Sequence, residues 1–352
     1  MQHSFNKVAR VIFWGCVSCV LAALLSLLGL ANFWMAFWGA WLLSASCFLL
    51  LASFTVPATG RAVLVTGCDS GIGHALALHL DRLGFRVFAG CLLAEERAEG
   101  ADRLRRMGSH RLHVLQLDVC KQEQLDFALR TIRLTLADGE VLWALVNNAG
   151  ISTYGAVEWV PMTTYRKLLD VNVLGAIATT KTFLPLLRKA KGRVVNITSV
   201  EGRFATPLFS TYQLTKHALE CFSDCLRNEI KRFGVHVSIV EPGNFTAGTE
   251  LNTDEATKLY SQDMWIAMDE EVRAAYGANY FDHVVNTKLH NNKTGMADLS
   301  PVMEVLTQAL TQKFPQCRYV CASLSMIIMT FVAEHFPEWV FDWIYVDTEY
   351  LT

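Results

Sequence analysis

A glycine-rich turn, Thr66-Gly-Cys-Asp-Ser-Gly-Ile-Gly73, stands between the apolar run 62–65 and a stretch typical of a helix. Glycine at positions 67, 71 and 73 permits backbone conformations that a side chain forbids. It also lets a pyrophosphate approach the N–H groups at the start of a helix. The spacing differs from Gly-x-Gly-x-x-Gly, but the mechanics are those of the phosphate-binding turn of a doubly wound fold. Residues 66–73 are therefore predicted to bind a nucleotide.

Short apolar runs alternate with helical stretches over the rest of the chain. The runs are rich in Val, Leu and Ile, as in strands that are buried on both faces of a parallel sheet. Strands are predicted at 62–66, 86–89, 112–117, 142–147, 193–198, 236–241 and 319–321, and helices at 71–83, 122–137, 162–189 and 208–232. This order predicts an α/β fold: a single Rossmann-like domain with a doubly wound parallel sheet of about seven strands.

Residues 11–60 contain no Lys, Arg, Asp, Glu or His. As one helix they would extend about 75 Å, whereas the hydrocarbon core of a bilayer is about 30 Å thick. A break near residues 29–32 would give two transmembrane helices, 8–30 and 33–54, and we favour this hairpin over a single span. The run is too long for a cleaved signal peptide. We expect residues 1–56 to be a membrane anchor.

The number of spans decides on which side of the membrane the main domain lies. Lys7 and Arg10 favour a cytosolic N-terminus. Two spans would return the chain to the cytosol, whereas one span would place the domain in the lumen. We expect the endoplasmic reticulum membrane with a cytosolic domain; the mitochondrial inner membrane is the alternative.

Composition argues against two kinds of partner. The net charge is −2 and no block of Lys and Arg occurs, so nucleic acid is not expected. The ten cysteines include no CxxC and no matching pair of histidines, so no metal site is predicted.

Polar and small residues follow several of the predicted strands. They are Asp118 and Val119 after the third strand, Asn147 to Gly150 after the fourth, Ser199 after the fifth, and Pro242 and Gly243 after the sixth. Ligands of doubly wound folds bind where the carboxyl ends of the strands meet. These residues are therefore predicted to line one site with the glycine-rich turn.

Tyr212 and Lys216 are spaced i to i+4 on a predicted helix, so they share one face. Hydride transfer from an alcohol requires removal of the hydroxyl proton, and a tyrosine with a pKa near 10 is a poor base at neutral pH. A nearby cation favours the phenolate, and Lys216 supplies one. Ser199 would hold the substrate oxygen, and Asn172 would position a water that links Lys216 to solvent. These four residues are the predicted catalytic set.

These motifs, in this order, resemble the short-chain dehydrogenase/reductase family over about residues 61–320. The resemblance implies an NAD(P)-dependent alcohol dehydrogenase or reductase with a Ser/Tyr/Lys/Asn tetrad. The implied cofactor-binding residues are Thr66, Gly67, Asp69, Ser70, Gly71, Ile72, Gly73, Asp118, Val119, Asn148, Ala149, Gly150, Tyr212, Lys216, Pro242 and Gly243.

Within that family, the chain is similar to the branch of the type 2 17β- and 11β-hydroxysteroid dehydrogenases, the retinol dehydrogenases and D-β-hydroxybutyrate dehydrogenase. The stretches 62–71, 88–92, 142–150, 181–188 and 241–245 carry this similarity. The anchor at 37–49 looks like the steroid enzyme, whereas 150–155 and 341–346 look like the hydroxybutyrate enzyme. The substrate therefore stays open between these classes.

The residues beside the expected adenosine ribose favour NAD over NADP. An NADP site usually offers a cation to the 2′-phosphate, but Ser70 and Cys91 are both uncharged. The acid that usually binds the ribose is absent from the end of the second strand, so Asp69 or a backbone group would replace it.

Residues 61–322 are expected to form the dehydrogenase domain, with an insertion at 244–300 as a lid over the substrate. Ser199, Arg203, Tyr212 and Phe245 are the candidate substrate contacts. Arg203 is the best candidate cation for a carboxylate, or equally a surface arginine. The apolar segment 323–352 is expected to contact the bilayer or a partner in a homodimer, with burial against the domain as the alternative.

The leading hypothesis is a membrane-anchored NAD-dependent enzyme that oxidises a small lipophilic secondary alcohol, a steroid or retinoid. Oxidation of a hydroxy acid such as D-β-hydroxybutyrate is second. An inactive NAD-binding membrane scaffold is the alternative from a different class, and the intact Tyr212, Lys216, Ser199 and Asn172 argue against it.

Overall fold

The computed structural model describes residues 2–249 and 253–346. Its centre is a sheet of seven parallel strands in the order β3-β2-β1-β4-β5-β6-β7. The strands are β1 (Arg61–Thr66), β2 (Arg86–Cys91), β3 (Leu112–Gln116), β4 (Val141–Asn147), β5 (Arg193–Ile197), β6 (His236–Pro242) and β7 (Arg318–Cys321). The predicted fold and all seven predicted strands are confirmed.

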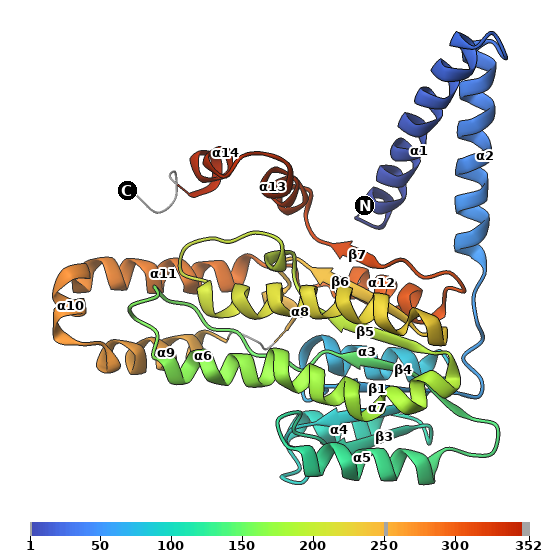
Figure 1. Cartoon of the computed structure of the whole chain (residues 1–352). Coiled ribbons are helices and arrows are strands. Elements are labelled where there is room, and N and C mark those ends of the chain that lie inside the picture. Colours follow the sequence, from blue (N-terminus) through green and yellow to red (C-terminus); the bar gives the residue numbers. More distant parts are fainter. Residues whose placement is uncertain (1, 250–252, 347–352) are drawn as a thin grey trace.

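Helices cover both faces of the sheet (Figure 1). Those on one face are α3 (Gly71–Arg82), α4 (Glu99–Met107) and α12 (Ser300–Thr311), and those on the other are α5 (Gln122–Thr135), α7 (Ala176–Ala190) and α8 (Ser210–Ile230). Leu80 and Leu306 are fully buried in the first layer, and Phe183 and Ile132 in the second. Each such side chain stabilises the fold by about 1.5–3 kcal/mol. Helices α4 and α12 were not among the predicted helices.

The helix predicted at 162–189 is interrupted. It consists of α6 (Met162–Leu169), a π-helical turn η1 (Asp170–Gly175) and α7. A Cβ on Gly175 would lie 2.6 Å from Cγ2 of Val119, so the turn brings the backbone against the loop after β3. Such π-helical turns often lie at functional sites, and this one contains Asn172.

All strands are parallel, so their carboxyl ends meet at one edge of the sheet. The chain order reverses between β1 and β4, which lie side by side at the centre. The glycine-rich turn follows β1 and Asn148 follows β4. This is the edge and the switch point at which doubly wound folds bind ligands.

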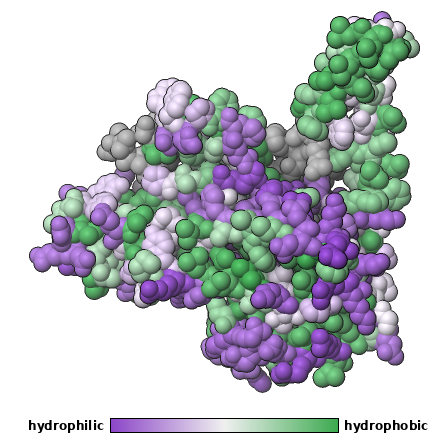
Figure 2. All heavy atoms as spheres, in the orientation of Figure 1, coloured by the Kyte–Doolittle hydropathy of each residue, from purple (hydrophilic) through white to green (hydrophobic). Residues whose placement is uncertain are grey.

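An antiparallel pair of helices projects from the domain (Figure 1), and the part of it that is coloured in Figure 2 is mostly hydrophobic on the face in view. These are α1 (Gln2–Leu27) and α2 (Phe33–Ser53). The carboxamide of Asn32 caps α2, and Trp41 Nε1 donates to the carbonyl of Val11 at 2.9 Å across the pair. By length and composition α2 can cross a membrane, whereas the apolar part of α1, Val11–Leu27, is shorter. The two-span anchor stays a prediction.

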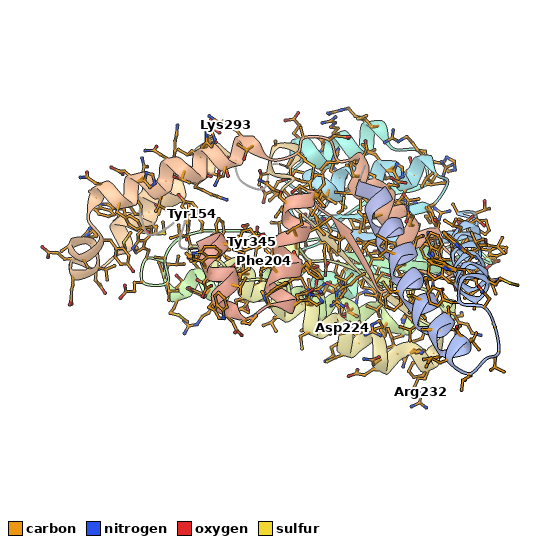
Figure 3. All side chains as sticks on the ribbon, turned by 90° about the horizontal axis from the view of Figure 1, so that it is seen from above. Tyr154, Phe204, Asp224, Arg232, Lys293 and Tyr345 are labelled. Carbon is orange, nitrogen blue, oxygen red and sulfur yellow. The ribbon has the colours of Figure 1, made fainter. Side chains whose placement is uncertain are left out.

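The insertion between β6 and α12 forms three helices: α9 (Asp254–Ala267), α10 (Glu270–Tyr276) and α11 (Ala278–Thr294). They share a separate apolar cluster with the segment after β4, in which the rings of Trp159 of that segment and Phe281 of α11 lie 5.3 Å apart. Tyr154 of the loop after β4 lies beside these helices in Figure 3 and belongs to the same cluster. We call α9, α10 and α11 the lid.

The C-terminal segment contains α13 (Leu324–His335), α14 (Glu338–Phe341) and the π-helical turn η6 (Asp342–Val346). It lies on the side of the domain from which α1 and α2 project (Figure 1). Its inner side packs on the domain, where Tyr345 and Phe204 share a cluster (Figure 3). Large apolar side chains remain exposed on it, including Phe331, Trp339 and Trp343. The segment therefore combines burial against the domain with an exposed apolar surface.

Candidate active site

The carboxyl ends of the strands open into a cleft of about 730 Å³. Most of the residues predicted for the site line it. These are Gly67, Asp69, Ser70, Gly71, Ile72, Asp118, Val119, Asn148, Ala149, Gly150, Ser199, Tyr212, Lys216, Pro242, Gly243 and Phe245. Thr66, Gly73, Asn172 and Arg203 do not line it.

The glycine-rich turn has the backbone conformation that it was predicted to need. Gly67 has φ +67° and Gly71 has φ +59°, both in the left-handed region. A Cβ on Gly67 would lie 2.7 Å from Cα of Ala149, so a side chain would also collide with the loop after β4. Helix α3 begins at Gly71, which directs its first N–H groups to the cleft. The turn therefore fits the pyrophosphate of a dinucleotide.

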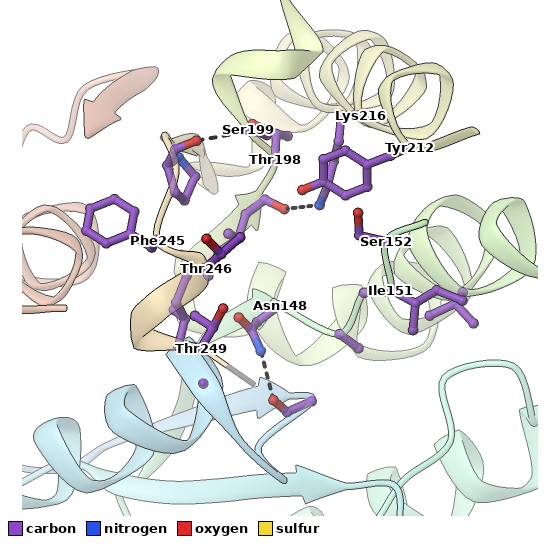
Figure 4. A pocket seen from close by; sticks show the side chains of 18 of the residues that line it. Asn148, Ile151, Ser152, Thr198, Ser199, Tyr212, Lys216, Phe245, Thr246 and Thr249 are labelled. Atoms are coloured by element: carbon purple, nitrogen blue, oxygen red, sulfur yellow. Dashed lines mark hydrogen bonds between the residues drawn. The ribbon is translucent and has the colours of Figure 1, made fainter. Parts of the chain in front are cut away.

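Thr66 supports the turn from behind. Its hydroxyl accepts hydrogen bonds from the backbone N–H of Asn148 at 3.1 Å and of Ala149 at 3.0 Å. The carboxamide of Asn148 donates in return to the carbonyls of Thr66 and Gly67, at 2.8 Å and 2.9 Å (Figure 4). Thr66 thus ties the end of β1 to the end of β4.

Asp69 links the turn to the loop after β2. Its carboxylate accepts hydrogen bonds from the backbone N–H of Leu92 at 2.8 Å and of Leu93 at 3.0 Å. Among the described residues, the cations that line the cleft are Lys167, Lys216 and Lys288. None of the three belongs to the turn or to the loop after β2.

Tyr212, Lys216 and Ser199 lie together in the cleft (Figure 4). The Nζ of Lys216 lies 5.3 Å from the centroid of the Tyr212 ring and donates to the carbonyl of Ile197 at 3.1 Å. The hydroxyl of Ser199 donates to the carbonyl of Pro242 at 3.3 Å. Helix α8 supplies the first two residues from successive turns, and the end of β5 supplies the third.

The site holds its phenol in the protonated form. Burial raises the pKa of Tyr212, and the Glu201 carboxylate raises it further, while a hydrogen bond with Ser199 opposes them. Burial lowers the pKa of Lys216 to about 8, although Glu201 and Glu220 favour its charged form. Tyr212 therefore keeps its proton, and it needs added positive charge nearby to act as a base.

Asn172 lies behind the cleft, 1% exposed. Its carboxamide oxygen accepts from the N–H of Ile151 at 2.8 Å, and its nitrogen donates to the carbonyl of Ile151 at 2.9 Å and to Oγ1 of Thr215 at 3.0 Å. Both N–H groups are thus used by protein atoms. In this arrangement Asn172 holds the loop after β4 against α8, and its predicted contact with a water remains a prediction.

Arg203 does not offer a free cation to a substrate. Its guanidinium pairs with Glu241 at 2.8 Å and with Glu334 of α13. Glu241 is fully buried, so it needs a cation beside it. The suggested role of Arg203 in binding a substrate carboxylate therefore has to be corrected: it joins β6 to the C-terminal segment.

Several residues of the cleft were missed by the sequence analysis. Asn244, Thr246 and Thr249 line it directly after β6. Their place after Pro242-Gly243 is a signal that the strand-end rule could have used. Glu201 and Lys288 also line it. Lys288 comes from the lid, and no local pattern points to it.

Comparisons with known proteins identify the family of the chain. The model of the short chain dehydrogenase family matches residues 61–259. D-beta-hydroxybutyrate dehydrogenase, mitochondrial, of Rattus norvegicus is 47% identical over 82% of this chain and 84% of its own. Estradiol 17-beta-dehydrogenase 2 of Rattus norvegicus is 38% identical over 83% of this chain and 77% of its own. Retinol dehydrogenase 7 of Mus musculus is 40% identical over 74% of this chain and 79% of its own.

A solved structure has the same fold. The crystal structure of a short-chain dehydrogenase from Streptomyces avermitilis matches with a TM-score of 0.62 and 28% identity, over 78% of this chain and 91% of that one. The family match and these relatives agree on the class of the protein. The chain belongs to the short-chain dehydrogenase family, in the branch of the hydroxybutyrate, steroid and retinol dehydrogenases, and is an oxidoreductase that uses NAD or NADP.

Proposed function

We propose that this enzyme oxidises a lipophilic alcohol, either the secondary alcohol of a steroid or the primary alcohol of a retinoid, with NAD at a membrane. The observation that carries the proposal is the common cleft of Tyr212, Lys216, Ser199 and the glycine-rich turn. This cleft combines a turn that fits a pyrophosphate with side chains that can transfer a proton to or from an alcohol oxygen.

In the oxidation, Tyr212 takes the proton of the substrate hydroxyl as the carbinol carbon loses a hydride. When bound, an oxidised nicotinamide would supply the hydride acceptor and a positive charge near the phenol. Lys216, 5.3 Å from the Tyr212 ring centroid, stabilises the phenolate. Ser199 holds the substrate oxygen by a hydrogen bond. In the reduction, Tyr212 returns the proton.

The loop after β2 supports NAD as the cofactor. A 2′-phosphate needs a cation there, but the described residues of that loop and of the turn that line the cleft are uncharged or acidic. Asp69 is bound to the N–H groups of Leu92 and Leu93, which places a carboxylate beside the loop. A carboxylate repels a phosphate, so NAD is favoured over NADP.

The C-terminal segment supports a lipophilic substrate. Met326 of α13 lines the cleft, while Ile328 and Phe331 of the same helix are exposed. Because α13 lies on the side from which α1 and α2 project (Figure 1), we propose that its exposed side meets the bilayer surface. A lipophilic alcohol could then reach the cleft from the membrane. A homodimer that covers the same surface is the alternative.

A two-span anchor can be tested by protease protection in sealed microsomes. Two spans put the N-terminus and the domain on the same side, so an N-terminal tag and the domain should be digested together from the cytosolic side. If only one of them is digested while the vesicles stay sealed, the two-span anchor is wrong.

Oxidation of a hydroxy acid is the second candidate. Two observations favour it: the 47% identity to D-beta-hydroxybutyrate dehydrogenase and the presence of Lys288 in the cleft. Arg203 contributes nothing to it, because Glu241 and Glu334 occupy its guanidinium.

The deciding experiment measures NADH formation by membranes that contain the full chain. Estradiol, retinol and hydroxybutyrate are compared, each with NAD and with NADP. We expect turnover of a lipophilic alcohol and a preference for NAD. Activity on hydroxybutyrate alone would replace the leading proposal by the second candidate.

A further inference from the structure

Two oppositely charged side chains line the cleft beside the catalytic groups, and the mechanism uses neither of them. Glu201 lies two positions after Ser199, in the short helix η2 (Val200–Gly202), and Lys288 lies on α11 of the lid. Both share the cleft with Tyr212. The lid and the end of β5 thus each supply one charge to the wall of the site.

Aromatic rings hold Lys288 in position. Its Nζ lies 5.7 Å from the centroid of the Tyr154 ring and 5.2 Å from that of Phe209. Tyr154 is itself fixed, because it is 3% exposed and its hydroxyl hydrogen-bonds to Ser261 at 2.6 Å. Phe209 directly precedes α8, the helix that carries Tyr212. The ammonium is therefore placed by the same elements that place the catalytic phenol.

Neither charge has a close ionic partner within the described chain. No carboxylate there lies within ion-pair distance of Lys288, whereas Lys293 on the same helix pairs with Asp254 at 3.1 Å. Glu201 accepts a long hydrogen bond of 3.4 Å from the carboxamide of Gln213. Burial raises the pKa of Glu201 and lowers that of Lys288, and each charge opposes the shift of the other. Both side chains are partly buried in the cleft wall and lack a strong partner, which a ligand could supply.

We propose that Glu201 and Lys288 form a subsite that binds a second, uncharged oxygen of the substrate, a hydroxyl or ketone apart from the carbinol that is oxidised. A hydroxyl can donate to Glu201 and accept from Lys288. A substrate carboxylate would instead meet the like charge of Glu201. The inference rests on the proposed alcohol dehydrogenase function and narrows its substrate to lipophilic alcohols with two oxygen groups.

The test uses three steroid alcohols that share a 17β-hydroxyl and differ only at C3: estradiol carries a hydroxyl, 3-deoxyestradiol carries hydrogen, and the third carries a carboxylate. NADH formation by membranes with the full chain gives kcat/KM for each. Hydrogen bonds to charged groups predict that estradiol exceeds the 3-deoxy compound by about 10- to 100-fold. Equal values, or preference for the carboxylate, would overturn the subsite.

Substitutions assign the preference to the two residues. Lys288→Met and Glu201→Gln should each reduce the ratio of estradiol to 3-deoxyestradiol at least about tenfold. Lys293→Met on the same helix, whose side chain is exposed, should leave the ratio unchanged. A fluorescence assay of NADH binding checks that each variant folds. If Lys288→Met does not fold, the ratio measured for Glu201→Gln alone tests the subsite. Ratios that stay as in the unmodified enzyme would overturn the assignment.

The outcome also separates this inference from the proposed function. If neither the three steroids nor retinol is turned over while NADH still binds, the proposed function fails, and the subsite that rests on it fails as well. If all three are turned over at similar rates, the proposed function stands and the subsite fails.

Discussion

The Nζ of Lys216 lies 5.3 Å from the centroid of the Tyr212 ring and donates its hydrogen bond to the carbonyl of Ile197. The ammonium is thus held near the phenol without an ion pair to it. Because burial disfavours the phenolate, Tyr212 gains from a positive charge brought close to it, whereas the same charge would disfavour the ammonium of Lys216 further. The proton-transfer step is therefore coupled to binding of the oxidised cofactor.

Gly67→Ala should abolish cofactor binding. The new Cβ would be strained at φ +67° and would lie 2.7 Å from Cα of Ala149, so the turn has to move. Gly139→Ala is the matched control, because Gly139 has φ +83° but nothing within 4 Å of the added atom. The control should lose about 1–2 kcal/mol of stability and still bind NADH. Normal NADH affinity in Gly67→Ala, measured by fluorescence titration, would contradict the role of the turn.

Leu92→Arg should shift the cofactor preference toward NADP. The backbone N–H of Leu92 is bound by Asp69 at the end of β2, where a guanidinium could pair with a 2′-phosphate. We expect the ratio of kcat/KM for NADP to that for NAD to rise at least about tenfold. Leu134→Arg, at an exposed position of α5, should leave the ratio unchanged. An unchanged ratio in Leu92→Arg would remove this loop from the cofactor site.

Lys216→Met should raise the stability of the fold at neutral pH while it abolishes activity. The pKa of Lys216 is lowered from 10.5 to about 8 by burial, so between these values the unfolded chain binds a proton that the folded chain has lost. Stability therefore rises with pH through this window, and below it the charge costs roughly 1–3 kcal/mol. Loss of the cation beside Glu201 and Glu220 offsets part of the gain.

The measurement is the thermal midpoint of the detergent-solubilised protein between pH 7 and pH 10.5, without cofactor. Lys216→Met should melt higher at pH 7 and lack part of the rise that the unmodified enzyme shows above about pH 8. Lys293→Met, an exposed lysine, serves as the control. A lower midpoint for Lys216→Met, with the pH-dependent rise intact, would contradict the inferred cost of the buried charge.

The arrangement of the strands could be predicted from the sequence because it depends on local patterns. Runs of Val, Leu and Ile predicted the seven strands, and the residues at the strand ends met at one edge because parallel strands require it. The π-helical turn at Asn172 was missed, since a single inserted residue hardly changes the helical periodicity.

The two cations show where local patterns stop being informative. Arg203 is near Ser199 in the sequence, yet it follows the short helix η2 and pairs with the buried Glu241 outside the cleft. Lys288 is far from the catalytic residues in the sequence, yet the lid returns it to the cleft wall beside Phe209. The pairing of Arg203 with Glu241 and the packing of the lid on the domain distinguish the two cations.

The most direct test of the central claim is Tyr212→Phe in the full chain, assayed in membranes for NADH formation from estradiol and for NADH binding. The phenylalanine keeps the ring but cannot transfer a proton, so kcat should fall by about 10²- to 10⁴-fold while the NADH dissociation constant stays the same. Turnover that persists at the unmodified rate would contradict the role of Tyr212 as the proton-transferring group.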